Sequence, residues 1–331
     1  MNFHSFAKSL GAAALVAGFA GGLLANTAIA AEKVRVALIA SDDSGYGYQV
    51  RNFIKGVEER LPGQFEFTIY PDAQLGKPDA IMNNIQLGSL EMAILSSTVI
   101  RLDKKLGIFD LPWLFADRDH VKRAMMGPLG DEMLSFIEET GNLKALAIYE
   151  TGFRQVMNKD RPIVVPDDLN GLKIRISGGK FRQEVFEALG ANPVPVVWNE
   201  LYTAAQTGVV DGAEAAIFYL DDANLGEVMP YLSYTNHVYS PAFLVASDAF
   251  FESLSDEQQQ TFRESALEIR EGAYAWAEES DQQIVDRMVE KSGVEINEIN
   301  FEAFSAKIGP VYEQYQDNYG SEWLNMIEEA R

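Results

Sequence analysis

The chain has 331 residues, of which 49 are acidic and 27 basic, so that its formal net charge is −22 at pH 7. A charge of this sign and size makes nucleic acids and anionic membrane surfaces poor partners. The chain contains no cysteine, which excludes thiol catalysis, disulfide bonds and cysteine-ligated metals. The hydrophobic fraction of 47% is ordinary for a globular protein, and stability has to come from an apolar core.

The first 30 residues have the pattern of a secretory signal. Lys8 supplies a positive charge, an apolar stretch interrupted by glycines covers residues 10–24, and Ala28-Ile29-Ala30 has the small-x-small pattern of a cleavage site. The apolar stretch is short for a retained membrane anchor. We therefore expect cleavage after about Ala30 and export of the mature protein, and the family resemblance described below implies that it is exported to the periplasm.

Strand and helix patterns alternate in the next part of the chain. In order, the sequence predicts a strand at 34–40, a helix at 48–61, a strand at 65–69, a helix at 78–87 and a strand at 92–95. A β-α-β-α-β order is typical of a doubly wound α/β unit with a parallel sheet. Ligands of such sheets bind beyond the carboxyl ends of the strands, which here are the turns at 41–45 and 96–97.

A second α/β unit is predicted from about residue 153 to Asn236. Thr151-Gly152 separates two predicted strands, and we place the first crossing between units there. The predicted elements are strands at 143–149, 153–157 and 172–176, helices at 180–189 and 199–206, a strand at 213–218 and a returning strand at 242–246.

The C-terminal part is predicted to be helical. Ser255 and Gln258 form a capping box, and the helical pattern that follows reaches about Lys291, long enough to span both units. A stripe of aromatic residues at helical spacing comes later: Tyr312, Tyr315, Tyr319 and Trp323. Core packing is the favoured interpretation of this stripe, and a platform for sugars is the alternative.

Two arginines carry the strongest chemical signal. Arg154 and Arg175 each lie in an apolar segment with strand character, and an unpaired buried charge is very costly. A carboxylate that arrives from outside is the expected partner. Motifs of hydrolases, nucleotide-binding proteins and zinc proteases are absent, and His120 and His237 are isolated in the sequence. The chain is therefore not expected to be an enzyme.

Ordered sequence blocks resemble the solute-binding proteins of tripartite ATP-independent periplasmic (TRAP) transporters, in the C4-dicarboxylate and sialic acid receptor branch. The blocks are Q-L-G at 74–76, G-S-L-E-M-A at 88–93, G-F-R-Q at 152–155, D-L-N-G-L-K-I-R at 168–175 and N-E-L-Y-T-A-A-Q-T-G-V-V-D-G-A-E at 199–214. The similarity extends over essentially the whole mature chain. It implies a two-lobed α/β fold of the periplasmic binding protein type, with a long helix spanning both lobes.

The expected division of the chain follows from the predicted elements and this resemblance. After the signal at 1–30, lobe I takes 31–151 and 240–275, lobe II takes 152–239 and 276–305, and a C-terminal helix at 306–331 packs on both. Closure of the lobes would be a hinge motion at 150–153 and 238–242.

The resemblance places a ligand between the lobes. Arg175 occupies the family's carboxylate-anchoring position, and its two parallel N–H donors match a carboxylate; pairing with an internal acid is the alternative. Arg154 either binds the same carboxylate or braces the cleft. Trp198 aligns with an aromatic position beside the ligand, or packs on the following helix.

Further residues indicate which ligands the expected pocket accepts. Ser96 and Ala215 stand where sialic acid receptors carry an acidic residue and an asparagine, which makes sialic acid an unsuitable ligand. Glu214 and Phe218 are expected in the pocket wall, and Ser44 in a loop of lobe I that faces it. Arg182 either meets a second acidic group of the ligand or is exposed.

The sequence thus predicts a receptor for a small organic carboxylate, with a sugar acid or hydroxy acid first and a C4-dicarboxylate second. By resemblance, it delivers this solute to the small and large membrane subunits of an ion-gradient-driven permease and is a monomer. No cofactor is expected, and no metal, because the tryptophan beside the metal-holding glutamate of the α-keto-acid branch is missing. A receptor for a sensor kinase and an exported enzyme acting on a carboxylate are the alternatives.

Overall fold

The computed structural model describes residues 31–331, so the signal segment and its expected cleavage site lie outside the described residues. The first unit has the predicted order of elements: β1 (Glu32–Ala37), α1 (Gly45–Arg60), β2 (Phe65–Tyr70), α2 (Pro78–Gln86) and β3 (Met92–Leu95). Strand β1 lies between β2 and β3 and pairs with both in parallel, which confirms the α/β prediction for this part of the chain.

The second unit repeats this arrangement. Its elements are β5 (Lys173–Ile176), α5 (Lys180–Ala188), β6 (Asn192–Pro195), α6 (Leu201–Gln206) and β7 (Gly212–Ala216). Strand β5 lies between β6 and β7, again in parallel. The strand predicted at 213–218 is too long, because helix α7 (Ile217–Asp222) begins directly after β7.

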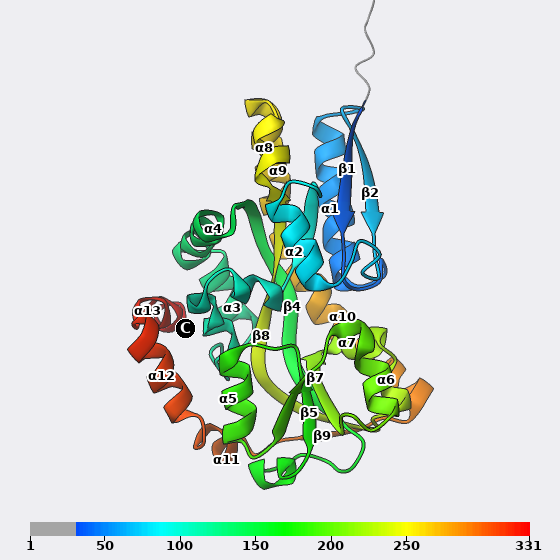
Figure 1. The fold of residues 1–331 in the computed structure, drawn as a ribbon, viewed down its shortest axis with the longest axis vertical. Helices are drawn as coiled ribbons and strands as arrows, with labels where there is room; N and C mark the ends of the chain where they lie inside the picture. The colour runs from blue at the N-terminus through cyan, green and yellow to red at the C-terminus, as the bar shows by residue number, and fades with distance from the viewer. Residues whose placement is uncertain (1–30) are drawn as a thin grey trace, which may run out of the picture. The chain divides into compact units, whose positions relative to one another are not determined.

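Two long antiparallel strands, β4 (Leu143–Asn158) and β8 (Tyr231–Ser247), run between the two units (Figure 1). Strand β3 pairs with β8, and β7 pairs with β4. All units therefore share one sheet with the order β2-β1-β3-β8-β4-β7-β5-β6, and β9 (Glu295–Glu298) pairs with β8.

The prediction that Thr151-Gly152 breaks the chain into two strands was wrong. Strand β4 continues through these residues, with a register shift against β8 between Glu150 and Gly152. Gly152 has a φ of 115°, a conformation that glycine adopts without a steric penalty. A local bulge of this kind bends a strand without ending it.

The remaining helices cover the sheet. They are α3 (Arg118–Met125), α4 (Pro128–Gly141), α8 (Asp248–Ser253), α9 (Asp256–Glu268), α10 (Arg270–Ser292), α11 (Phe301–Ser305), α12 (Gly309–Tyr319) and α13 (Glu322–Glu329). The capping box of Ser255 and Gln258 is confirmed. The predicted single helix is two, because the backbone turns at Ile269.

Helix α10 is the predicted long helix that contacts both units. Its Trp276 stacks on Tyr48 of α1, with ring centroids 5.2 Å apart. Near its other end, Arg287 forms an ion pair with Asp221 of α7. Among residues 31–331, no helix is both long and apolar enough to cross a membrane.

The C-terminal aromatic stripe belongs to the core. Tyr315 and Trp323 are buried, and the hydroxyl of Tyr315 donates to the carbonyl of Lys105 at 2.9 Å. The hydroxyl of Tyr312 donates to the carbonyl of Pro112 at 2.8 Å. Core packing, rather than a sugar platform, therefore accounts for these residues.

Candidate ligand-binding site

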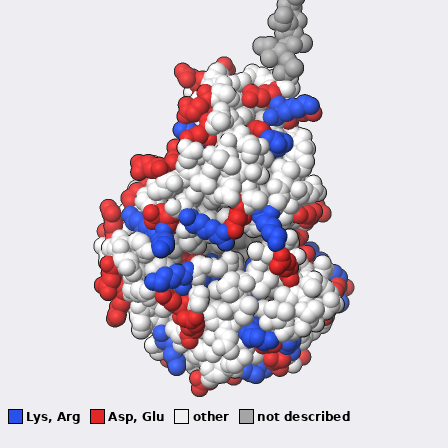
Figure 2. Space-filling model, viewed as in Figure 1, with Lys and Arg blue, Asp and Glu red and all other residues white. Residues whose placement is uncertain are grey.

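A cavity of about 450 Å³ lies where the carboxyl ends of the parallel strands of both units meet. Its walls come from the segments that follow β1, β3, β5 and β6, from β7, and from the start of α2. They include Ile39, Lys77, Asp79, Ser96, Ser97, Thr98, Arg101, Arg154, Arg175, Ser177, Trp198, Ala215 and Tyr219. Figure 2 shows a hollow at mid-height with Lys and Arg side chains around it. The volume suits a small metabolite.

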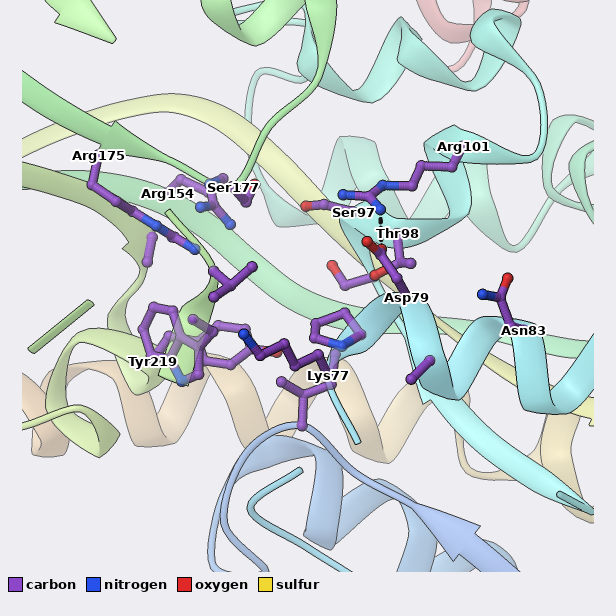
Figure 3. A pocket seen from close by; sticks show the side chains of 17 residues that line it. Lys77, Asp79, Asn83, Ser97, Thr98, Arg101, Arg154, Arg175, Ser177 and Tyr219 are labelled. Carbon is purple, nitrogen blue, oxygen red and sulfur yellow. Dashed lines mark ion pairs between the residues drawn. The ribbon is translucent and has the colours of Figure 1, made fainter. Parts of the chain in front are cut away.

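Arg175 lies at the end of β5 and points into this cavity (Figure 3). The residue is 2% exposed. Its Nε donates to the carbonyl of Val196 at 2.8 Å, and this bond fixes the plane of the guanidinium. No hydrogen bond to another described residue occupies the two terminal nitrogens. The geometry leaves a two-pronged donor directed at the cavity.

The charge of Arg175 has no adjacent counter-charge in the part of the chain that the structure describes. No carboxylate of the described residues lies within ion-pair distance of it, whereas the other charged residues of the cavity wall are all paired. Burial lowers the pKa of the Arg175 guanidinium to about 9, although Glu214 favours the charged form from a distance. An anionic ligand would restore the lost electrostatic stabilisation.

Trp198 supports the guanidinium from one side. The Arg175 Cζ atom lies 5.4 Å from the centroid of the Trp198 ring, within the range of a cation–π interaction. The Trp198 ring in turn packs on Tyr219, with centroids 4.5 Å apart. Trp198 thus lies in the cavity wall, and its ring packs on Tyr219 of α7 rather than on the helix α6 that directly follows it.

Arg154 is in the cavity wall but already has a partner. Its Nε and Nη2 both donate to the carboxylate of Glu214, the latter at 2.9 Å, and Nη2 also donates to the Glu214 carbonyl at 2.8 Å. Burial alone would raise the pKa of Glu214, but Arg154 and Arg182 hold it well below its usual value. This arrangement favours the bracing interpretation of Arg154.

The alternative that Arg182 is exposed was wrong. Arg182 is 1% exposed and lies behind the cavity, where it forms ion pairs with Asp110 and Glu214. It is not a surface residue, and its partners in the structure are the internal carboxylates of Asp110 and Glu214. Glu214 also lies behind the wall rather than in it.

Two other predicted residues lie elsewhere. Ser44 and Phe218 line a different cavity of about 440 Å³, beside Trp276 of α10. Ser44 caps α1 by accepting a hydrogen bond from the backbone of Gly47. Ser96 and Ala215 do line the main cavity, although the Ser96 hydroxyl donates to the carbonyl of Pro241 at 2.9 Å.

Sequence reasoning missed three charged residues of the wall: Lys77, Asp79 and Arg101. Lys77 and Asp79 lie at the start of α2, and Arg101 ends the 3₁₀ helix η1 (Ser97–Arg101) that follows β3. Their signal was available, because both segments follow strand ends at the same edge of the sheet. Within the described residues, no cluster of three or more His, Asp or Glu side chains has the geometry of a metal site.

Two α/β units joined by crossing strands around a cationic cavity are the architecture of a solute receptor. The family described as "Bacterial extracellular solute-binding protein, family 7" matches residues 36–318, and the chain belongs to this family of TRAP solute-binding proteins.

Individual relatives agree with this assignment. The chain is 31% identical over 332 residues to the 2,3-diketo-L-gulonate-binding periplasmic protein YiaO of Escherichia coli (strain K12), a match that covers 98% of this chain and 99% of the relative. A TRAP solute-binding protein of Chromohalobacter salexigens, solved with bound D-glucuronate, is 30% identical with a TM-score of 0.85, over 90% of this chain and 100% of that one. A Polaromonas protein bound to D-erythronate is 27% identical with a TM-score of 0.86, over 90% and 98%.

Proposed function

We propose that this protein is a periplasmic receptor that binds a small organic carboxylate between its two units and delivers it to a TRAP membrane permease. The buried guanidinium of Arg175 carries this proposal. Its terminal nitrogens face a cavity of about 450 Å³, and no described carboxylate neutralises it. A ligand carboxylate would complete a bidentate ion pair there.

The ligands of relatives support the class of solute. The proteins of known structure that resemble this chain were solved with D-erythronate, D-glucuronate, galactonate and succinate. Most of these ligands are sugar acids with one carboxylate, and a dicarboxylate occurs among them. We place a sugar acid or hydroxy acid first for this chain and a C4-dicarboxylate second.

Binding is proposed to close the two units about residues 150–153 and 238–242. The bulge at Gly152 in β4 lies at the first of these positions. Closure would bring the first unit's hydroxyl-bearing segment, Ser97 and Thr98, onto a ligand held by Arg175 of the second. A ligand that touches both units favours the closed state by its differential affinity. Export with cleavage after about Ala30 places the receptor beside its permease.

A thermal-shift screen of the mature protein against sugar acids, hydroxy acids and dicarboxylates tests the proposal. An acid at 100 times its dissociation constant stabilises by about 2.7 kcal/mol, or roughly 5–10 °C in melting temperature. The protein is first unfolded and refolded to remove any copurified ligand. Uptake by the reconstituted permease, with and without the receptor, then tests delivery.

Arg175→Ala is the decisive variant, and Arg263→Ala is its matched control. Arg263 pairs with Glu138 at 3.3 Å, is 42% exposed in its side chain and does not line the cavity. We expect the shift to vanish in Arg175→Ala and to persist in Arg263→Ala. A shift that survives Arg175→Ala would contradict the anchor, and no shift with any acid would contradict the ligand class.

A further inference from the structure

The far end of the cavity carries an ion pair that the proposed function does not yet use. In Figure 3, Arg101 and Asp79 lie on the opposite side of the cavity from Arg175 and Arg154, joined by the dashed ion pair. Asp79 is in the first turn of α2, and Arg101 ends the 3₁₀ helix after β3. Both belong to the first unit, so the pair exists whether or not the two units are closed.

This pair differs in its exposure from the ion pair of Arg154 and Glu214 on the other side of the cavity. The Arg101 and Asp79 side chains are 57% and 52% exposed, whereas those of Arg154 and Glu214 are 4% and 0% exposed. Neither Arg101 nor Asp79 has a further side-chain hydrogen bond to a described residue. Unused guanidinium donors and unused carboxylate lone pairs therefore remain available to a ligand.

The pair offers donors and acceptors together, at almost no net charge. A hydroxyl group both donates and accepts, so it can bond to Arg101 and Asp79 at once. A carboxylate only accepts, and at this place it would meet the like charge of Asp79 as well as Arg101. Neutral groups of Asn83, Ser97 and Thr98 complete this end of the cavity, and they also suit hydroxyl groups.

We propose, on the basis of the proposed function, that Asp79 is a specificity-determining residue that selects ligands with a polyhydroxylated, uncharged tail over dicarboxylates. Asp79 neutralises Arg101 and thereby prevents it from acting as a second carboxylate anchor. Arg175 then remains the single cation of the cavity wall without a partner among the described residues, and it holds the ligand's one carboxylate.

Two pairs of acids isolate this effect. D-Gluconate and D-glucarate differ only at the far carbon, which is a hydroxymethyl group in the first and a carboxylate in the second, and D-galactonate and galactarate form the second pair. Calorimetric dissociation constants give the ratio of dicarboxylate to monocarboxylate affinity for each pair. For the wild type we expect the monocarboxylate to bind at least about tenfold more tightly.

Substitutions on the two sides of the ion pair should move this ratio in opposite directions. Asp79→Asn keeps the shape of the side chain and frees the charge of Arg101, so the ratio should shift about tenfold or more toward the dicarboxylate. Arg101→Gln leaves Asp79 without its partner, so the ratio should shift toward the monocarboxylate. The double variant should lose the dicarboxylate gain of Asp79→Asn.

Asp160→Asn is the matched control, because Asp160 is exposed, forms no ion pair with another described residue and does not line the cavity. It changes the net charge equally and should leave the affinity ratio unchanged.

Two results would overturn the role of Asp79: an unchanged ratio in both Asp79→Asn and Arg101→Gln, or shifts of the same sign in the two variants. Binding that depends on Arg175 would in that case still support the receptor function. A wild type that prefers the dicarboxylates would also overturn the role of Asp79. Failure of every acid to bind would instead refute the proposed function itself.

Discussion

The two α/β units have the same strand arrangement but bring different chemistry to the cavity. In each unit the first strand lies between the other two, and the carboxyl ends face the cavity. Among the described residues, the second unit supplies Arg175 without a counter-charge, while the first supplies hydroxyl groups and the ion pair of Arg101 and Asp79. Under the two proposals above, one unit binds the charge of the ligand and the other binds its uncharged tail.

The largest expected effect is the loss of stability when the buried, paired carboxylate of Glu214 is replaced. Glu214 is fully buried and bonds to Arg154 and Arg182. Glu214→Gln leaves the buried guanidinium of Arg154 without its carboxylate and Arg182 with Asp110 alone, and we expect a loss of about 3–5 kcal/mol in the free energy of unfolding. Denaturant unfolding of the ligand-free protein measures it.

Arg175→Met is the counterpart to Glu214→Gln. It removes a buried charge that has no adjacent partner among the described residues, so the ligand-free protein should unfold at the same or a higher denaturant concentration than the wild type. If Arg175→Met were destabilised as strongly as Glu214→Gln, Arg175 would have an internal partner, and the contrast between the two arginines would fail.

The sequence predicted the parts of this contrast that depend on local pattern. The apolar strand that carries Arg175 and the arrangement of the first unit are readable from alternation and turn residues. The partners of Arg182 are not, because Asp110 comes from a segment 72 residues earlier in the chain and Glu214 lies 32 residues later. A helical arginine of that kind looks like a surface residue until the other elements pack around it.

The continuity of the long strands β4 and β8 could likewise not be predicted from the sequence. Gly152 in β4 resembles a chain break in sequence, and only the pairing with β8 shows that the strand continues through it. For β8, the prediction covered residues 242–246 of a strand that spans Tyr231–Ser247. Whether a glycine ends a strand or bends it depends on the neighbouring strand, which is information from distant sequence.

A second acid beside an arginine sharpens the comparison with Glu214. Glu150 in β4 pairs with Arg118 at 2.7 Å, but burial dominates and raises the pKa of Glu150 to about 7. Its folded-state pKa thus lies above the unfolded value of about 4.5. As pH rises, the unfolded state therefore loses this proton first. The Glu150 carboxyl thus lowers the free energy of unfolding progressively between about pH 4.5 and 7.

Glu150→Gln should remove this cost. Relative to the wild type, the variant should gain stability between pH 5 and pH 8, by up to about 3 kcal/mol for a shift of this size. Melting temperatures across this range give the measurement. Glu138→Gln, at a half-exposed pair with Arg263, is the control and should show no comparable trend. A difference from wild type that did not vary with pH would refute the raised pKa.

The smallest expected effect concerns the ion pair between the two units at the cavity rim. Lys77, next to α2 in the first unit, lies 2.6 Å from Glu200 of the second, and the side chains are 54% and 58% exposed. Exposed pairs contribute about 0.2–1 kcal/mol, so Glu200→Gln should barely change the melting temperature.

The pair joins the units only when they are close together. Its loss should therefore raise the ligand dissociation rate by at most about fivefold, the factor that corresponds to 1 kcal/mol. Stopped-flow fluorescence of the tryptophans, Trp198 among them, reports this rate. Glu59→Gln, at the surface pair with Lys55, makes the same charge change away from the cavity and should leave the rate unaltered.

The dependence on salt tests whether this effect is electrostatic. High salt should abolish the difference in dissociation rate between Glu200→Gln and wild type, because screening removes the attraction that the substitution deletes. A difference that persisted in high salt would assign the effect to packing at the cavity rim rather than to charge.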